Sequence, residues 1–207
     1  MPRKRRLDFE GAIWHVTVRG VERRRIFLDA SHRELHLAIL AETVDRFEWE
    51  CHAYCQMDNH WHLLIRTPKP TLSEGMQFLN GTYAQAFNAI TGRTGHLFQG
   101  RFASVLVERE AHLLAVMRYT VLNRVRAGAC ENVADWIWSS YRATAGLAPV
   151  PPFLEVGWTL RQFDPRSTIR AQAAYRDFVG RGPGAASLRG VILAARSSYR
   201  AQLREAA

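Results

Sequence analysis

The pattern of apolar and polar residues predicts four β-strands. Residues 13–19 alternate between the two kinds and are rich in β-branched and aromatic side chains, as expected for a strand with one buried face. Residues 50–57 and 60–66 have the same character, and the two turn-forming residues between them make this pair a hairpin. Residues 102–107 supply a fourth strand. Between these short strands lie longer segments with a different period.

The longer segments have the spacing of helices. Apolar side chains recur every three or four residues over 35–47, 73–90 and 110–127, and Gly128 ends the last of these segments. The resulting order is β-α-β-β-α-β followed by further helices. This order predicts an α+β fold of the ferredoxin-like (RRM-like) kind. Such a fold has a four-stranded antiparallel sheet with helices on one face, here with a C-terminal helical extension.

Charge is distributed unevenly along the chain. The net charge of +9 comes from the two ends: residues 1–25 contain eight Arg and Lys against three acidic residues, and residues 161–207 contain nine against three. Almost all of this excess is arginine, which binds phosphate through paired hydrogen bonds and stacks on bases. A nucleic-acid partner follows as a hypothesis, with an ordinary soluble basic surface as the alternative.

Composition also suggests a division of the chain and a compartment. Residues 1–148 contain every element named above and are expected to form one domain, whereas residues 149–207 form a basic extension rich in Pro, Arg and Ala, with a helix over 187–204. No run of 18 apolar residues occurs, so no membrane partner is expected. Three cysteines without a Cys-x-x-Cys pair are typical of reduced thiols, and we expect a cytoplasmic, nucleoid-associated protein.

The third predicted strand carries two histidines, His60 and His62, on either side of Trp61. Side chains alternate along a strand, so both imidazoles leave from one face, roughly 6.5–7 Å apart along the backbone. Trp61, Leu63 and Ile65 then point to the opposite face, toward a core. A pair of histidines in this position is suited to hold a metal ion or a phosphate.

The third predicted helix carries Tyr119 and Asn123, four residues apart and so on one helix face. Alone, a helical tyrosine is most often core packing. Beside a histidine pair and a basic surface, it has the chemistry of phosphoryl transfer, since a metal polarises the phosphate and a tyrosine hydroxyl attacks phosphorus. His15 on the first strand either touches this site or is an ordinary core or surface histidine.

These residues belong to five ordered motifs spread over about residues 11–142. The motifs are Trp14-His-Val-Thr-Val-Arg-Gly20, Ala53-Tyr-Cys-Gln-Met-Asp-Asn-His-Trp-His-Leu-Leu-Ile65, Gly95-His-Leu-Phe-Gln-Gly-Arg-Phe102, Arg118-Tyr-Thr-Val-Leu-Asn-Arg-Val-Arg-Ala-Gly128 and Trp138-Ser-Ser-Tyr141. Together they resemble the single-tyrosine HUH transposases, and more closely the REP-associated tyrosine transposases of bacteria.

The resemblance implies a role for each site residue. His60 and His62 would be metal ligands, Tyr119 the nucleophile, and Asn123 the residue that completes the metal site. The protein would then cut single-stranded DNA beside a hairpin and become joined to the 5′-phosphate, with Mg²⁺ or Mn²⁺ as the ion. Members of the family act as monomers or homodimers, and both remain open. The basic C-terminal extension is either a hairpin-binding segment or a loosely packed tail.

Two positions depart from the family pattern. The family usually has Met-Pro-Asn-His where this chain has Asp58, and Asn-Pro-Val-Arg where it has Arg124. Asp58 either joins the second shell of the metal or is a solvated turn residue. Arg124 removes a proline kink and adds positive charge near the nucleophile. These departures leave one alternative function, a domesticated hairpin-binding protein without cleavage; an RNA-binding module is a weaker third.

Basic residues along the chain supply the expected contacts with DNA. These residues are Arg3, Lys4, Arg5, Arg6, Arg19, Arg23, Arg24, Arg25, Arg93, His96, Arg101, Arg124 and Arg126.

Overall fold

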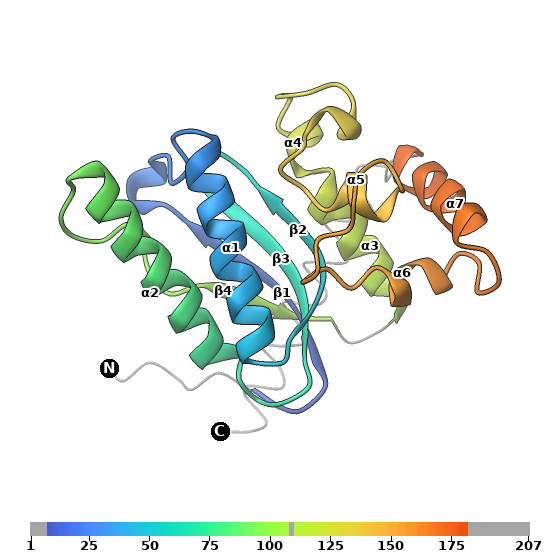
Figure 1. The fold of residues 1–207 in the computed structure, drawn as a ribbon, viewed down its shortest axis with the longest axis horizontal. Coiled ribbons are helices and arrows are strands. Elements are labelled where there is room, and N and C mark those ends of the chain that lie inside the picture. Colours follow the sequence, from blue (N-terminus) through green and yellow to red (C-terminus); the bar gives the residue numbers. More distant parts are fainter. Residues whose placement is uncertain (1–7, 108–109, 182–207) are drawn as a thin grey trace.

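An antiparallel sheet forms the centre of the molecule (Figure 1). The computed structural model describes residues 8–107 and 110–181. Its strands, β1 (Ala12–Arg19), β2 (Glu50–Gln56), β3 (His60–Thr67) and β4 (Ala103–Leu106), lie in the order β2-β3-β1-β4. Each neighbouring pair is antiparallel. The predicted ferredoxin-like fold class is confirmed, and each strand begins and ends within one residue of its predicted bounds.

Two long helices, α1 (Ala30–Arg46) and α2 (Leu72–Thr91), cover one face of this sheet (Figure 1). The face carries Trp14, Trp61 and Leu63, all of which are buried against the two helices. Asp29 caps the start of α1, because its carboxylate accepts a hydrogen bond from the backbone N–H of His32 at 3.1 Å. The alternation of side chains along the strands therefore creates the apolar face on which α1 and α2 pack.

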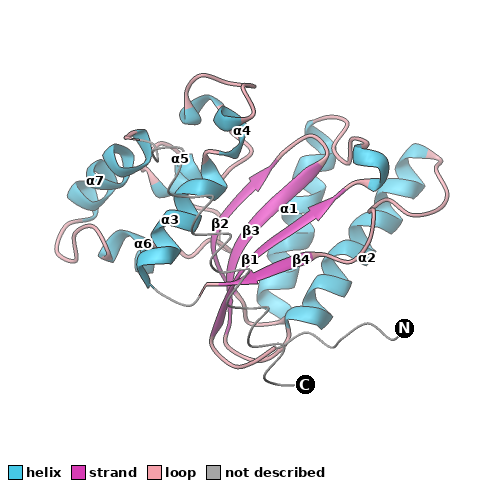
Figure 2. Cartoon of the chain, turned by 180° about the vertical axis from the view of Figure 1, so that it is seen from behind, coloured by secondary structure: helices cyan, strands magenta, loops and turns pink. Residues whose placement is uncertain are grey.

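The other face is partly covered by the helix α3 (Glu110–Val121), which packs against β2 and β3. Figure 2 shows α3 beside β2, on the side of the sheet away from α1 and α2. Ala53 and Leu64 point to this second face and are fully buried. Helices therefore lie on both faces rather than one, because the apolar β2–β3 edge of the second face also needs cover.

The third long helix is interrupted where a continuous one was predicted. The helix α3 ends at Val121 and a short helix, α4 (Asn123–Arg126), follows after Leu122. The amide nitrogen of Asn123 donates to the carbonyl oxygens of Tyr119 and Thr120 at 3.0 and 3.2 Å. A continuous helix would offer these carbonyls to backbone N–H groups, so the side chain competes with the backbone at the interruption.

The remaining elements are short until the last helix: η1 (Val21–Arg23), η2 (Val133–Asp135), α5 (Tyr141–Thr144), α6 (Gly157–Arg161) and α7 (Thr168–Gly180). Tyr175 and Val179 of α7 are buried in the same cluster as Val116 and Met117 of α3. The described part of the predicted extension thus packs on α3. The helix predicted over 187–204 lies outside the described residues. None of the described helices is both long and apolar enough to cross a membrane.

Candidate active site

Four polar side chains gather on the second face of the sheet, at its centre. His60 and His62 come from β3 and His15 and Thr17 from β1, and the strand register places Thr17 opposite His62. The imidazole centroids of His60 and His62 are 5.1 Å apart, and His15 stacks on His62 at 5.3 Å. The period of two along each strand is what brings all four to one face.

Hydrogen bonds fix one nitrogen of each of the paired imidazoles. His60 Nδ1 lies 2.7 Å from Asn59 Oδ1. His62 Nδ1 lies 3.1 Å from His15 Nε2 and 3.2 Å from the Thr17 hydroxyl. The other nitrogen of His62, Nε2, is buried and has no hydrogen-bond partner among the described residues. Histidines that bind metals are commonly held in this way, with one nitrogen anchored by a neighbour and the other free for the ion.

Both imidazoles are neutral at pH 7. Burial lowers the pKa of His62 well below its usual value, and the nearby His15, His60 and Arg19 lower it further. Burial and then the positive charge of Arg19 lower the pKa of His60 to about 4. The neutral imidazole is the form that ligates a metal, so binding would require no proton release from this pair near neutral pH.

Tyr119 of α3 lies against the histidines. The centroid of its half-buried ring is 5.7 Å from that of His15 and 5.9 Å from that of His62, edge to face in both cases. The guanidinium carbon of Arg126 lies 5.0 Å from the centroid of the same ring. Residues from β1, β3, α3 and α4 therefore meet at one place, and an arginine charge lies beside the tyrosine.

Asn123 occupies the first position of α4, where its amide nitrogen is bonded to the backbone of α3. Its amide oxygen is the atom with a lone pair suited to a metal. Within residues 8–107 and 110–181, no group of three or more His, Cys, Asp or Glu side chains is arranged to hold a metal ion. The histidine pair would therefore need ligands of another kind, such as an amide, water or phosphate oxygen.

Basic residues surround this group on two sides. Arg23 and Arg25 line a cavity of about 540 Å³ together with Asn59 and His60. Arg19, Arg23 and Arg101 line a second cavity of about 290 Å³, which reaches Thr17.

Other predicted DNA-binding residues lie elsewhere. Arg24 forms an exposed ion pair with Glu22 at 2.7 Å, and His96 lines a groove beside α2. The guanidinium carbon of Arg93 lies 6.0 Å from the ring of Phe87. Arg3, Lys4, Arg5 and Arg6 fall outside the described residues.

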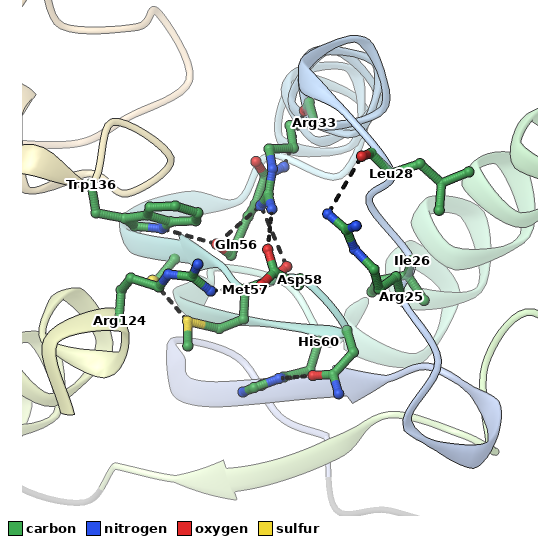
Figure 3. Close-up of polar contacts among 12 residues, drawn as sticks. Arg25, Ile26, Leu28, Arg33, Gln56, Met57, Asp58, His60, Arg124 and Trp136 are labelled. Carbon is green, nitrogen blue, oxygen red and sulfur yellow. Dashed lines mark hydrogen bonds and ion pairs between the residues drawn. The ribbon is translucent and has the colours of Figure 1, made fainter. Parts of the chain in front are cut away.

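The two positions that depart from the family pattern contact each other. Arg124 Nη1 lies 2.8 Å from one carboxylate oxygen of Asp58, and Arg33 of α1 lies 2.7 Å from the other (Figure 3). Asp58 is therefore neither a freely solvated turn residue nor bonded to a histidine. The guanidinium of Arg124, predicted to contact DNA, is used at least in part inside the protein.

Sequence reasoning missed Thr17 and Asn59, which hold His62 and His60. A signal for Thr17 was present, since it lies two residues after His15 on the same strand face. For Asn59 the signal was its place directly before His60 in a turn, where a short amide side chain can reach its neighbour.

Comparison with known proteins supports a single family. Residues 9–121, more than half of the chain, match the family described as IS200-like transposases. A REP-associated tyrosine transposase of Escherichia coli K12 is 25% identical over 154 residues, which cover 72% of this chain and 90% of that protein.

A solved structure of a REP-associated tyrosine transposase bound to a REP hairpin has a TM-score of 0.60 at 22% identity, covering 75% of this chain and 93% of that one. These findings confirm both the fold and the resemblance to REP-associated enzymes. Because the family match runs from β1 through α3 and includes the histidine pair and Tyr119, this chain belongs to the IS200-like transposase family.

Proposed function

We propose that this protein is a metal-dependent single-strand DNA endonuclease and strand transferase that acts at DNA hairpins. The observation that carries the proposal is the packing of the Tyr119 ring against the imidazoles of His15 and His62. The hairpin as substrate is carried over from the REP hairpin bound by the structural relative.

The histidine pair fits a divalent metal ion, Mg²⁺ or Mn²⁺. His62 Nε2 is a buried acceptor with no partner among the described residues, and the Nδ1 atoms of His60 and His62 are already engaged. The Nε2 atoms of His60 and His62 would hold the ion, with the amide oxygen of Asn123 completing the protein ligands. Such an ion supplies neutralisation of the negative charge that develops on the scissile phosphate.

Tyr119 would perform the covalent step. Its hydroxyl oxygen attacks phosphorus and loses its proton, a bond from that oxygen to phosphorus forms, and the bond from phosphorus to the 3′-oxygen breaks. The 3′-oxygen takes up a proton and leaves, while the 5′-phosphate stays on the tyrosine. Attack by another 3′-hydroxyl on this phosphotyrosine would reverse the step and join strands. Arg126, beside the Tyr119 ring, would stabilise charge on the phosphate oxygens.

Single-stranded DNA would follow the basic side of the second sheet face. Arg19, Arg23 and Arg101 line the cavity that reaches Thr17, and Arg25 lines the cavity beside His60. His60 lines one of these cavities, and Thr17, which lies 3.2 Å from His62 Nδ1, lines the other, so phosphates on either side of the scissile bond would meet arginine. Because one chain supplies His60, His62 and Tyr119 together, we propose that a monomer carries a complete site.

The nucleophile is tested by covalent capture. Wild-type protein incubated with a hairpin oligonucleotide carrying a single-stranded flank and Mn²⁺ should give a protein–DNA adduct that survives denaturing electrophoresis. Tyr119→Phe should give none, while it binds the hairpin as the wild type does. An adduct formed by Tyr119→Phe would refute the assignment.

The metal site is tested by measuring how Mn²⁺ changes the thermal midpoint of the protein. His60→Ala and His62→Ala should each abolish the rise in thermal midpoint that Mn²⁺ causes in the wild type, because an ion that binds only the folded state stabilises it.

The alternative function is a hairpin-binding protein without cleavage, and the departures from the family pattern at Asp58 and Arg124 motivate it. It would be favoured by wild-type protein that binds hairpins in a salt-sensitive manner and yields no adduct.

A further inference from the structure

We propose that the ion pair between Asp58 and Arg124 positions the nucleophile, by tying the helix segment next to Tyr119 to the turn that directly precedes His60. This inference rests on the proposed function, and it makes Asp58 and Arg124 positioning residues rather than catalytic ones. Both residues would then act through contacts inside the protein and not through contacts with DNA.

The carboxylate of Asp58 uses both oxygens in ion pairs with two different helices. Arg124 Nη1 of α4 lies 2.8 Å from Oδ2, and Arg33 Nη2 of α1 lies 2.7 Å from Oδ1 (Figure 3). Arg33 is only 5% exposed, and its Nη1 also donates to the carbonyl oxygens of Gln56 and Met57 at 3.3 and 3.4 Å. Arg33 is thus fixed to the end of β2, and it holds the Asp58 carboxylate in place for Arg124.

An indole ring confines the same two arginines. The guanidinium carbon of Arg124 lies 4.2 Å from the ring centroid of Trp136, and that of Arg33 lies 5.0 Å from it. Trp136 is itself anchored, because its indole N–H donates to the carbonyl oxygen of Gln56 at 3.0 Å. Stacking on a fixed ring restricts the rotation of Arg124 and favours one geometry of the ion pair.

The turn that carries Asp58 also orients a histidine. The neighbouring residue, Asn59, accepts a hydrogen bond from His60 Nδ1 at 2.7 Å and donates from its amide nitrogen to the carbonyl oxygen of Arg23 at 2.8 Å. Two consecutive residues of one turn therefore act on the two halves of the site. Asn59 sets the imidazole of His60, and Asp58 sets the segment that follows the tyrosine.

The interruption at Leu122 explains why such a tie is needed. Since α3 ends at Val121 and α4 begins at Asn123, the position of α4 is not dictated by a continuous helix. Arg124, Arg126 and Asn123 all lie on α4, and Arg126 stacks on the Tyr119 ring. A contact that fixes α4 to the β2–β3 turn therefore fixes the surroundings of Tyr119 relative to the histidines.

The geometry favours a persistent pair. Both carboxylate oxygens of Asp58 lie within 2.8 Å of a guanidinium nitrogen, one from Arg124 and one from Arg33. Charge-assisted hydrogen bonds of this kind are among the stronger ones in proteins.

The test separates positioning from direct DNA contact. Asp58→Asn, Arg124→Gln and the double variant are compared with wild type, and Arg46→Gln on the far end of α1 is the control for loss of one positive charge. We expect Asp58→Asn and Arg124→Gln to lower the single-turnover rate of adduct formation at saturating hairpin by about 10- to 100-fold, as small misplacements of reacting groups do. Hairpin affinity should stay within about threefold of wild type, the double variant should be no slower than the slower single one, and Arg124→Lys should recover part of the rate.

Three outcomes would overturn the inference. One is unchanged rates in both single variants. Another is tighter hairpin binding by Asp58→Asn with weaker binding by Arg124→Gln, which would show that Arg124 contacts phosphate and Asp58 only restrains it. The third is an equal fall in affinity and rate with a lowered thermal midpoint, which would indicate general destabilisation. Wild-type protein without adduct would instead refute the proposed function, so the two failures are distinguishable.

Discussion

Individual histidines of this protein serve different purposes although several are buried. His36 of α1 points into the core, with its ring 5.1–5.3 Å from those of Phe27, Trp61 and Tyr83, and its Nδ1 lies 3.0 Å from Gln56 Nε2. His62 is equally buried but faces His60 and Tyr119 on the other side of the sheet. Burial and a lowered pKa are common to both histidines. What distinguishes a candidate ligand from a packing residue is therefore which side chains surround its ring.

His36 should make the stability of the protein depend on pH. Burial lowers its pKa to about 3, whereas the unfolded chain titrates near 6.5. Between these values only the unfolded chain binds a proton at this position, so the free energy of unfolding falls as pH falls from 6.5 toward 3, by up to about 1.4 kcal/mol per pH unit. His36→Leu should show a shallower decline in urea unfolding measured at pH 7, 6 and 5. Parallel curves for the two proteins would contradict this assignment.

At the scale of elements, α2 contains two glycines, Gly75 and Gly81, that differ in how much space surrounds them. A Cβ added at Gly75 would overlap the ring of Trp49, which is 4% exposed and donates its indole N–H to the Thr71 hydroxyl at 3.0 Å. A Cβ added at Gly81 would meet nothing within 4 Å. Gly75 is therefore required by the packing of α2, whereas Gly81 is not.

The two glycines give a matched pair of substitutions. Gly81→Ala should raise the free energy of unfolding by roughly 0.5–1 kcal/mol, because alanine loses less conformational entropy in a helix. Gly75→Ala should lower it by about 1–3 kcal/mol, since the methyl group forces the anchored indole to move. Chemical denaturation of the two variants checks the signs. Stabilisation by Gly75→Ala would mean that Trp49 moves aside at little cost.

For the whole molecule, the cluster on the second face of the sheet joins segments distant in sequence. Leu64 and Ala53 of the sheet, Val116 of α3 and Tyr175 of α7 belong to it. The carbonyl oxygen of Cys51 also accepts a hydrogen bond from the backbone N–H of Glu155 at 2.8 Å. The described residues beyond 148 thus share a core with those before it.

Truncation tests how far the first 148 residues form a separate domain. A chain ending at residue 148 should lose several kcal/mol of stability, because each fully buried side chain removed, such as Tyr175 or Val179, contributes about 1.5–3 kcal/mol. A chain ending at residue 181 keeps α6 and α7 and is the control. Equal thermal midpoints for the two chains would show that residues 149–181 are dispensable to the fold.

The basic excess of the molecule should appear as a salt dependence of DNA binding. Each arginine that neutralises a phosphate of single-stranded DNA adds about 0.7 to the slope of log affinity against log salt concentration. Arg101→Gln, beside the cavity that reaches Thr17, should reduce this slope by about that amount, and Arg46→Gln should leave it unchanged. A weaker affinity with an unchanged slope in Arg101→Gln would argue against a phosphate contact.

The sequence by itself determined the strands, the helix faces and the shared orientation of His60 and His62. These depend on local periods, because a strand alternates its side chains every two residues and a helix repeats every 3.6. Trp61 and Leu63 are buried on one face of β3 as the alternation predicts. The same local pattern did not reveal the burial of Leu64, whose cover by α3 comes from a segment about fifty residues later.

Only the tertiary structure decided which residues meet. The register of β1 against β3 brings Thr17 to His62, and the packing of α3 on the sheet brings Tyr119 to both His15 and His62. The pairing of Asp58 with Arg124, 66 residues apart, likewise depends on where α4 lies after its interruption at Leu122. Local spacing fixes the face on which a side chain lies, whereas contact between distant segments depends on register and packing, which no local period encodes.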